Sequence, residues 1–344
     1  MNLKQFLSSA YNDGVIDEET HHKLLEHKEH VYKDASTFKL MNIIQYLGVL
    51  IAMAFTTGFF AMNFGNFGWG GILFISILFA MVGFGLAERS KTNNEGVTIG
   101  IWATLGISSV PLMVYSVMSM VDSSLLVFDD YHRIVSGDWL LIEFATLVAA
   151  FVAFKRYSMP FLMLPVALTL WYFSMDVSIA TFSSAEYADW WDIRRYVSLV
   201  FGIGMLVWAF QWDVTNKAPV KDYPFWLYFF GVIAFTFGVS VLDTGGELGK
   251  FILFLISIAG LLLGGAIGRR VLVVFGGFGI FAYLNYLSWY KLDDVTLGFA
   301  LMALGGIFIA WLGSRWAKNE KVIESKLRSY LPEPVRNLLE QRMV

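Results

Sequence analysis

The chain has 344 residues, of which 57% are hydrophobic, 17% are aromatic and 15% are charged. Soluble domains carry about 25% charged residues, so this composition excludes an ordinary soluble protein and indicates a protein of the lipid bilayer. The chain has no cysteine and only five histidines, which excludes disulfides and thiolate chemistry, and a net charge of -3 gives no basis for nucleic-acid binding.

Residues 1–40 are predicted to form a cytoplasmic helical hairpin. Apolar residues recur at helical spacing from Leu3 to Tyr11. The sequence Asn12-Asp13-Gly14 favours a turn, and Asp17 is predicted to cap the second helix. A hairpin of this size is too small to hold an enzyme core. We therefore expect an interaction element that binds a cytoplasmic partner protein, a second copy of the chain in a homo-oligomer, or the inner loops.

Four of the five histidines lie on the second helix of this hairpin. His21, His22, His27 and His30 lie around Glu26. Pairs such as His22 and Glu26 share a helix face and could ligate a metal ion. The neighbouring lysines repel a cation, however, and the sequence supplies no third ligand. We predict a solvated helix, with no metal site and no cofactor.

Ten apolar stretches come close to the roughly 20 residues with which an α-helix crosses a bilayer. They cover residues 41–62, 69–87, 97–121, 139–154, 159–182, 194–212, 224–243, 250–268, 271–287 and 296–314. The sequence therefore predicts an all-α, polytopic transmembrane bundle over residues 41–314. A cytoplasmic amphipathic tail is expected over residues 315–344, interrupted by Pro332 and Pro334.

The basic residues predict the orientation of these spans. Twenty lysines and arginines fall on the side that holds both termini, and five fall on the opposite side. The five are Arg133, Arg194, Arg195, Lys250 and Lys291. Because short basic loops stay in the cytoplasm, both termini are predicted to be cytoplasmic.

Pro111 lies near the middle of the third expected span, beside Ser108 and Ser109. A proline frees the backbone carbonyl four residues earlier, and broken helices often line the binding sites of transporters. The two serine hydroxyls could bond the freed backbone or contact a solute. A packing kink and a solute site are both compatible with this pattern.

Two carboxylates are expected inside the outer half of the bundle, where an unpaired charge is costly. Glu143 lies in the fourth span and Asp176 in the fifth, while Arg194 and Arg195 open the sixth span on the same side. One geometry explains all four residues, namely a cluster in which the arginines pair with one or both carboxylates. It could be a structural clamp or a proton or substrate site, and separate charges that reach the surface remain a third interpretation.

Gly260, Gly264 and Gly268 recur at four-residue intervals in the eighth expected span. Small residues at this spacing let a neighbouring helix approach closely. The pattern predicts tight packing within the chain, and a homodimer face is the alternative. Since no strand precedes the later glycines of this region and the setting is lipid, a nucleotide-binding loop is excluded.

Two regions of the chain share their layout with one bacterial family. They are the hairpin turn Gly14–Glu19 and the glycine-rich stretch Leu261–Lys318, in which Arg269-Arg270 opens a span, Tyr283-Leu284 lies near its end and Gly305-Gly306 precedes a basic segment. The chain resembles a family of uncharacterised multi-span membrane proteins, defined only as a domain of unknown function, that begin with such a hairpin. The resemblance implies a bacterial inner-membrane protein, and it supplies no reaction, ligand or catalytic residue.

The remaining question is the class of function. The sequence has no nucleophile elbow, zinc-protease motif or phosphate loop, so we do not predict an enzyme. The number of spans, the Pro111 break and the buried carboxylates favour a transporter or permeation protein for a small solute or ion. The alternative is a non-transporting scaffold or sensor that recruits a cytoplasmic partner through the hairpin, and the glycine-rich spans favour it.

Overall fold

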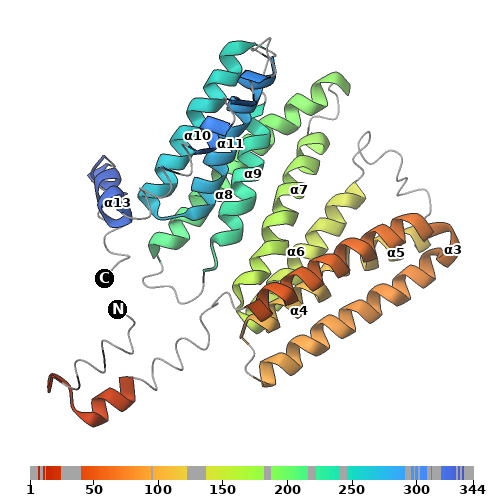
Figure 1. Ribbon diagram of the computed structural model, residues 1–344. Helices are drawn as coiled ribbons and strands as arrows, with labels where there is room; N and C mark the ends of the chain where they lie inside the picture. Colours follow the sequence, from red (N-terminus) through yellow and green to blue (C-terminus); the bar gives the residue numbers. More distant parts are fainter. Residues whose placement is uncertain are drawn as a thin grey trace. The chain divides into compact units, whose positions relative to one another are not determined.

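A computed structural model describes residues 7, 11, 13–24, 40–93, 96–121, 137–181, 187–215, 222–240, 246–290 and parts of 296–336. Every regular element in these residues is a helix, which confirms the predicted all-α class (Figure 1). The elements are α3 (Leu40–Thr92), α4 (Gly96–Ser108), α5 (Val110–Val121), α6 (Gly137–Tyr157), η2 (Pro160–Leu162), α7 (Met163–Thr181), α8 (Tyr187–Thr215), α9 (Phe225–Val239), α10 (Glu247–Ile267), α11 (Arg270–Tyr290) and α13 (Glu320–Ser329).

The chain divides into two compact units. Unit 1 comprises residues 1–126, 144–166 and 219–223, and unit 2 comprises residues 127–143, 167–218 and 224–344. Helices α3, α4 and α5 therefore belong to unit 1, and helices α8 to α11 belong to unit 2. Each unit is described separately below.

Six helices within the described residues are long and apolar enough to cross a bilayer. They are Gly68–Thr92, Gly96–Val121, Pro160–Val177, Trp191–Thr215, Glu247–Ile267 and Arg270–Ser288. These correspond to the second, third, fifth, sixth, eighth and ninth expected spans. Helix α9 is apolar but has only 15 residues, α6 carries several charged residues, and the tenth expected span is described only in part. The count of ten spans stays a prediction.

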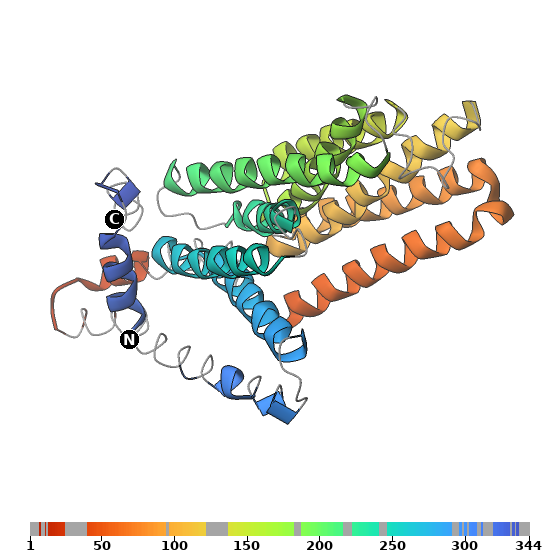
Figure 2. The same ribbon diagram turned by 90° about the horizontal axis from the view of Figure 1, so that it is seen from above.

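Helix α3 contains both of the first two expected spans. Its single left-handed residue, Gly68, has a φ of 60°, a conformation that glycine adopts without the steric penalty of a side chain. Figures 1 and 2 both show that the helix reverses direction near its middle, so α3 consists of two rods. The connection between the first two expected spans is thus a turn inside α3 and not a separate loop.

The core of unit 1 is built mainly from small and branched side chains on α3, α4, α6 and η2. Its fully buried members are Ala87, Ile99, Ala103, Ile107, Ala150, Ala153, Met159 and Leu162. Alanines at helix contacts let the backbones approach closely. A Cβ placed on Gly83 of α3 would lie only 2.5 Å from the backbone nitrogen of Gly106 on α4. Close packing therefore holds α3 against α4 in unit 1.

In unit 2, α8 and α9 form a closely packed pair. A Cβ on Gly202 of α8 would collide with the backbone of Phe235, and a Cβ on Gly238 of α9 would collide with the backbone of Leu199. Two glycines, one from each helix, thus bring the two backbones together. The contact holds Asp213, near the end of α8, beside Tyr228 at the start of α9.

The N-terminal turn has the predicted local geometry. The backbone nitrogen of Gly14 donates to the carbonyl oxygen of Tyr11 at 3.0 Å, and Gly14 has a φ of 70°. The backbone nitrogen of Thr20 donates to Asp17 Oδ1 at 3.1 Å, which confirms Asp17 as the predicted cap. The rings of Tyr11 and His21 stack with centroids 5.2 Å apart, so the turn is closed by a contact across it.

We expect Asp17→Ala to lower the helix content of a peptide spanning residues 1–36, because it leaves the first turn of the second helix without its acceptor. Hydrogen bonds from Thr20 hold the pKa of Asp17 below its usual value of 3.8. The ionised cap therefore stabilises the helix at neutral pH, and this contribution disappears as the pH falls through the lowered pKa. Circular dichroism of the wild-type and Asp17→Ala peptides between pH 7 and pH 2 measures the difference in helix content. The Asp17→Asn peptide is the control, and its helix content should equal that of wild type at neutral pH.

Helix α13, in the predicted C-terminal tail, packs against the end of α10. Ile323 and Leu327 share one face of α13 and are half-buried, while Val322 is exposed. Arg328 Nε donates to the carbonyl oxygen of Ala266 at 3.0 Å. This bond satisfies a carbonyl that the end of α10 leaves free. The tail is thus attached to unit 2 through a side chain that caps another helix.

Candidate functional site

Glu143 and Asp176 form a buried carboxyl pair in unit 2. Glu143 on α6 is 9% exposed and Asp176 on α7 is 3% exposed. The two side chains are close enough for their charges to interact. A carboxylate only accepts hydrogen bonds, so the pair is joined when one of the two carboxyls keeps a proton. The arrangement can therefore hold a proton between two helices.

The two arginines predicted beside these carboxylates have other contacts. Arg195 Nη1 pairs with Asp192 Oδ1 at 3.2 Å on its own helix. The guanidinium of Arg194, which is buried, lies 5.4 Å from the centroid of the Trp191 ring. The structure therefore brings together the two predicted carboxyls and gives Arg195 a different acid. An ion pair between Arg194 and either carboxyl stays a prediction.

The helix break at Pro111 is present, since α4 ends at Ser108 and α5 begins at Val110. The hydroxyl of Ser108 donates to the carbonyl oxygen of Leu105 at 2.8 Å, and that of Ser109 donates to Gly106 at 2.7 Å. Both hydroxyl protons are used by the last turn of α4. This geometry is that of a packing kink, with the serine donors already engaged.

The three regularly spaced glycines of α10 have three different environments. A Cβ on Gly264 would lie 2.7 Å from the backbone nitrogen of Val273, so Gly264 faces α11 closely. A Cβ on Gly260 would have no neighbour within 4 Å among the described residues. Gly268 follows the last residue of α10 and has a φ of 76°. Of the three, Gly264 is the one that makes a close helix contact within the described part of the chain.

A buried ion pair that the sequence analysis missed joins the C-terminal ends of α8 and α10. Arg269 Nε donates to Asp213 Oδ2 at 2.6 Å, and Arg269 Nη2 pairs with Asp213 Oδ1. The hydroxyl of Tyr228 donates to the same Oδ2 at 2.9 Å, and the guanidinium lies 5.2 Å from the Tyr228 ring centroid. The side chain of Asp213 is 0% exposed and that of Arg269 is 9% exposed. Bidentate geometry and the tyrosine compensate the charge of the buried carboxylate.

The left-handed glycine at the end of α10 places Arg269 in this cluster. The nitrogen of Arg269 donates to the carbonyl oxygen of Gly264 at 2.8 Å, and that of Gly268 donates to Gly265 at 3.3 Å. These two bonds form a Schellman motif, in which the chain turns sharply after the helix. The turn directs the next residue back toward the helix pair α8–α9. Gly268 is thus a positioning residue for the ion pair.

Both residues of this cluster lie at span ends, where the sequence pattern has a simpler interpretation. The sequence analysis counts Arg269 among the basic residues of the predicted cytoplasmic loops, where arginine determines topology. Asp213 follows Trp212 at the end of a span, a position at which a charge reaches water easily. An acidic residue at a span end that is predicted to face the basic side of the membrane was a usable indication of a buried partner.

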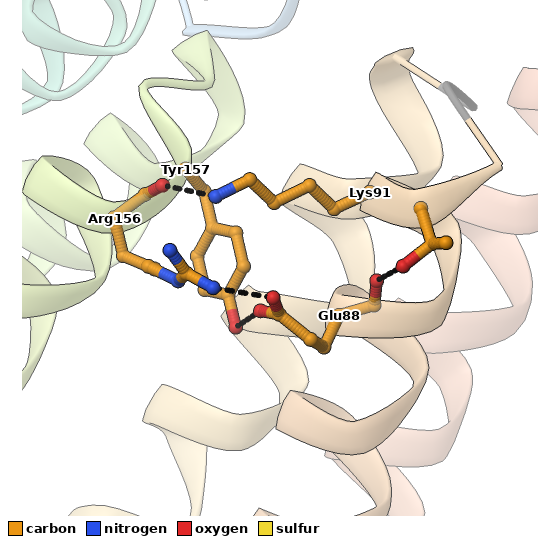
Figure 3. A network of polar contacts seen from close by, with 5 residues as sticks. Glu88, Lys91, Arg156 and Tyr157 are labelled. Carbon is orange, nitrogen blue, oxygen red and sulfur yellow. Dashed lines mark hydrogen bonds and ion pairs between the residues drawn. The ribbon is translucent and has the colours of Figure 1, made fainter.

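A second carboxylate–arginine–tyrosine cluster joins the ends of α3 and α6 in unit 1 (Figure 3). Glu88 pairs with Arg156 through Oε1, and the hydroxyl of Tyr157 donates to Glu88 Oε2 at 3.3 Å. Lys91 Nζ donates to the carbonyl oxygen of Arg156 at 3.1 Å. In contrast to the cluster in unit 2, the side chains of Glu88 and Arg156 are 46% and 56% exposed. This pair is therefore hydrated and contributes little to stability.

The predicted histidine group lies only partly within the described residues. His21 stacks on Tyr11 and lies edge-on to His22 with ring centroids 6.4 Å apart. Glu26, His27 and His30 lie outside the described residues. Among the residues that the structure describes, no group of three or more metal-ligating side chains comes together.

Comparisons of the chain with protein-family models, with curated proteins and with solved structures found no match. The resemblance to a bacterial family of membrane proteins therefore stays a prediction that rests on the hairpin turn and the glycine-rich stretch. The functional argument rests on the geometry of the chain itself.

Proposed function

We propose that this chain is a polytopic membrane transporter that couples proton binding to the passage of a small solute or ion. The observation that supports the proposal is the carboxyl pair formed by Glu143 and Asp176. Ionisable side chains inside a bilayer are costly and are typical of proton relays and substrate sites. A pair that shares one proton can lose it when a cation or a conformational change stabilises both charges.

The several apolar helices of the chain are compatible with this function. The pair lies on α6 and α7, consecutive long helices of the chain. In the predicted orientation it belongs to the outer half of the bundle. A proton taken up there from the outer side would reduce the two negative charges of the ionised pair to one, and its release would restore two adjacent negative charges for a cation to occupy.

The test uses the full chain in proteoliposomes loaded with a pH-sensitive dye. Inward gradients of sodium, potassium, and a set of small neutral and anionic solutes are imposed in turn. We expect at least one gradient to change the internal pH with the wild-type chain, and Glu143→Gln and Asp176→Asn each to abolish the response. Asp192→Asn, a neutralisation in an exposed ion pair, is the matched control and should keep the response.

The result also separates the two classes of function. A wild-type chain that produces no pH change with any gradient would contradict the proposal and favour the scaffold or sensor alternative. Equal responses from wild type and both carboxyl variants would show that transport, if present, does not use the pair. Thermal unfolding of each variant in detergent checks that a lost response is not a lost fold.

A further inference from the structure

The inner ends of α3 and α6 carry more positive charge than their own contacts neutralise. The two ends touch through the ion pair of Glu88 with Arg156 and the bond from Lys91 to the Arg156 carbonyl. Four basic residues lie on them, namely Arg89, Lys91, Lys155 and Arg156. Among the described residues of the same region, the acidic ones are Glu88 and Asp222, the latter adjacent to Tyr223, whose hydroxyl donates to the Ser158 carbonyl oxygen at 2.7 Å. A net positive charge therefore remains after the pairs are counted.

Arg89 and Lys155 are the residues of this set that are available to a ligand. Both are exposed, and neither forms an ion pair within the part of the chain that the structure describes. The Nζ of Lys155 lies 4.6 Å from the centroid of the Phe151 ring, one helical turn back from the end of α6. The ammonium group therefore packs on an exposed aromatic ring, and it has no acidic partner among the described residues.

Each of the two cations stands at the end of an exposed apolar stripe. On α6 the stripe consists of Phe144, Val148, Phe151 and Val152, all exposed. On α3 the exposed side chains Phe74, Leu78, Met81 and Val82 lead toward Arg89. These residues recur at three- and four-residue spacing, so each set occupies one helix face that ends in a cation. A ligand that fits both features has a long apolar part and an anionic head.

We propose that the inner ends of α3 and α6 bind an anionic phospholipid, whose phosphate group contacts Arg89 and Lys155 and whose acyl chains lie along the exposed stripes. The cytoplasmic leaflet is rich in anionic lipid, and the predicted orientation places these ends there. The Glu88–Arg156 pair and Lys91 hold the two helix ends together beneath the headgroup. Tyr157, bonded to Glu88, keeps that carboxylate turned toward Arg156 and away from the lipid phosphate.

Unit 2 supplies a matched comparison. At its inner end Arg269 is buried in the ion pair with Asp213, which leaves Arg270 and Lys326 as exposed cations. Arg89→Gln with Lys155→Gln and Arg270→Gln with Lys326→Gln thus remove the same charge from exposed side chains, one pair in each unit. None of the four side chains belongs to the carboxyl pair, and none forms an ion pair among the described residues.

The test is native mass spectrometry of the full chain in detergent with phosphatidylglycerol, with phosphatidylcholine, or with inorganic phosphate. We expect wild type to retain phosphatidylglycerol in preference to phosphatidylcholine. Since each basic residue near an anionic surface contributes about a fivefold gain in affinity, the Arg89 and Lys155 double variant should lose retention by roughly tenfold or more. The Arg270 and Lys326 double variant should retain the lipid as wild type does.

Three results would overturn the assignment. One is equal retention of the two lipids by wild type. Another is an equal loss in both double variants, which would indicate a general effect of charge. The third is displacement of phosphatidylglycerol by millimolar inorganic phosphate, which would assign the patch to a free anion. Transport by proteoliposomes is a separate readout, so failure of the proton-coupling proposal would leave this one standing.

Discussion

Arg269→Ala should lower the free energy of unfolding of the detergent-solubilised protein by about 3–5 kcal/mol. The substitution leaves the Asp213 carboxylate buried without its charged partner, while the Tyr228 hydroxyl still donates to it. Desolvation of an uncompensated charge is the largest cost that a single substitution can produce in this part of unit 2. Unfolding in a titration with sodium dodecyl sulfate, followed by circular dichroism, measures the difference.

Two variants serve as controls for this prediction. Arg156→Ala removes an arginine from the hydrated pair with Glu88 in unit 1, and its cost should not exceed about 1 kcal/mol. The double variant Arg269→Ala with Asp213→Ala removes both buried charges, so it should recover part of the loss seen in Arg269→Ala. A single variant as stable as wild type would show that Asp213 reaches water or is neutral when buried.

The second large effect concerns two glycines on the same helix. Gly264→Ala should destabilise the protein by about 1–3 kcal/mol, because its Cβ would lie 2.7 Å from the Val273 backbone nitrogen and force α10 and α11 apart. Gly260→Ala adds the same methyl group where no atom of the described residues lies within 4 Å. There the helix propensity of alanine should leave stability unchanged or raise it by up to about 1 kcal/mol.

The comparison of these two variants in one unfolding assay separates packing from propensity. Equal losses in both would mean that Gly260 also faces a neighbour, as the homodimer interpretation of the glycine stripe requires. The concentration dependence of the Gly260→Ala midpoint would then distinguish a second copy from lipid, because dimer stability depends on protein concentration.

Features that repeat along the sequence were predicted well. Composition and span length indicated an all-helical membrane protein, and six helices meet both criteria. Local hydrogen bonds were predicted equally well, since Asp17 caps its helix and the Ser109 hydroxyl donates to the backbone near Pro111. These properties depend on neighbours within a few residues, so no tertiary information is needed to find them.

Pairings across the fold were predicted less well. Glu143 and Asp176 were identified because charges inside spans are rare, but the sequence did not indicate that Arg195 pairs with Asp192 on its own helix. The Asp213–Arg269 pair was missed because both residues lie at span ends, where a charge can be hydrated or buried with the same sequence pattern. Only the close packing of α8, α9 and α10 distinguishes the two cases, and that packing depends on residues 56 positions apart in the chain.

The position of that buried ion pair also bears on how the chain is synthesised and inserted. On the predicted topology, Asp213 and Arg269 emerge on the cytoplasmic side, so neither charge has to be translocated across the membrane. Asp213 can stay hydrated while α9 and α10 insert, because its arginine is translated only after α10 is complete. The ion pair can therefore form only after α10 has been synthesised, which makes it a late step of assembly. A ribosome-stalled chain that ends before Arg269 would be expected to expose Asp213 to water.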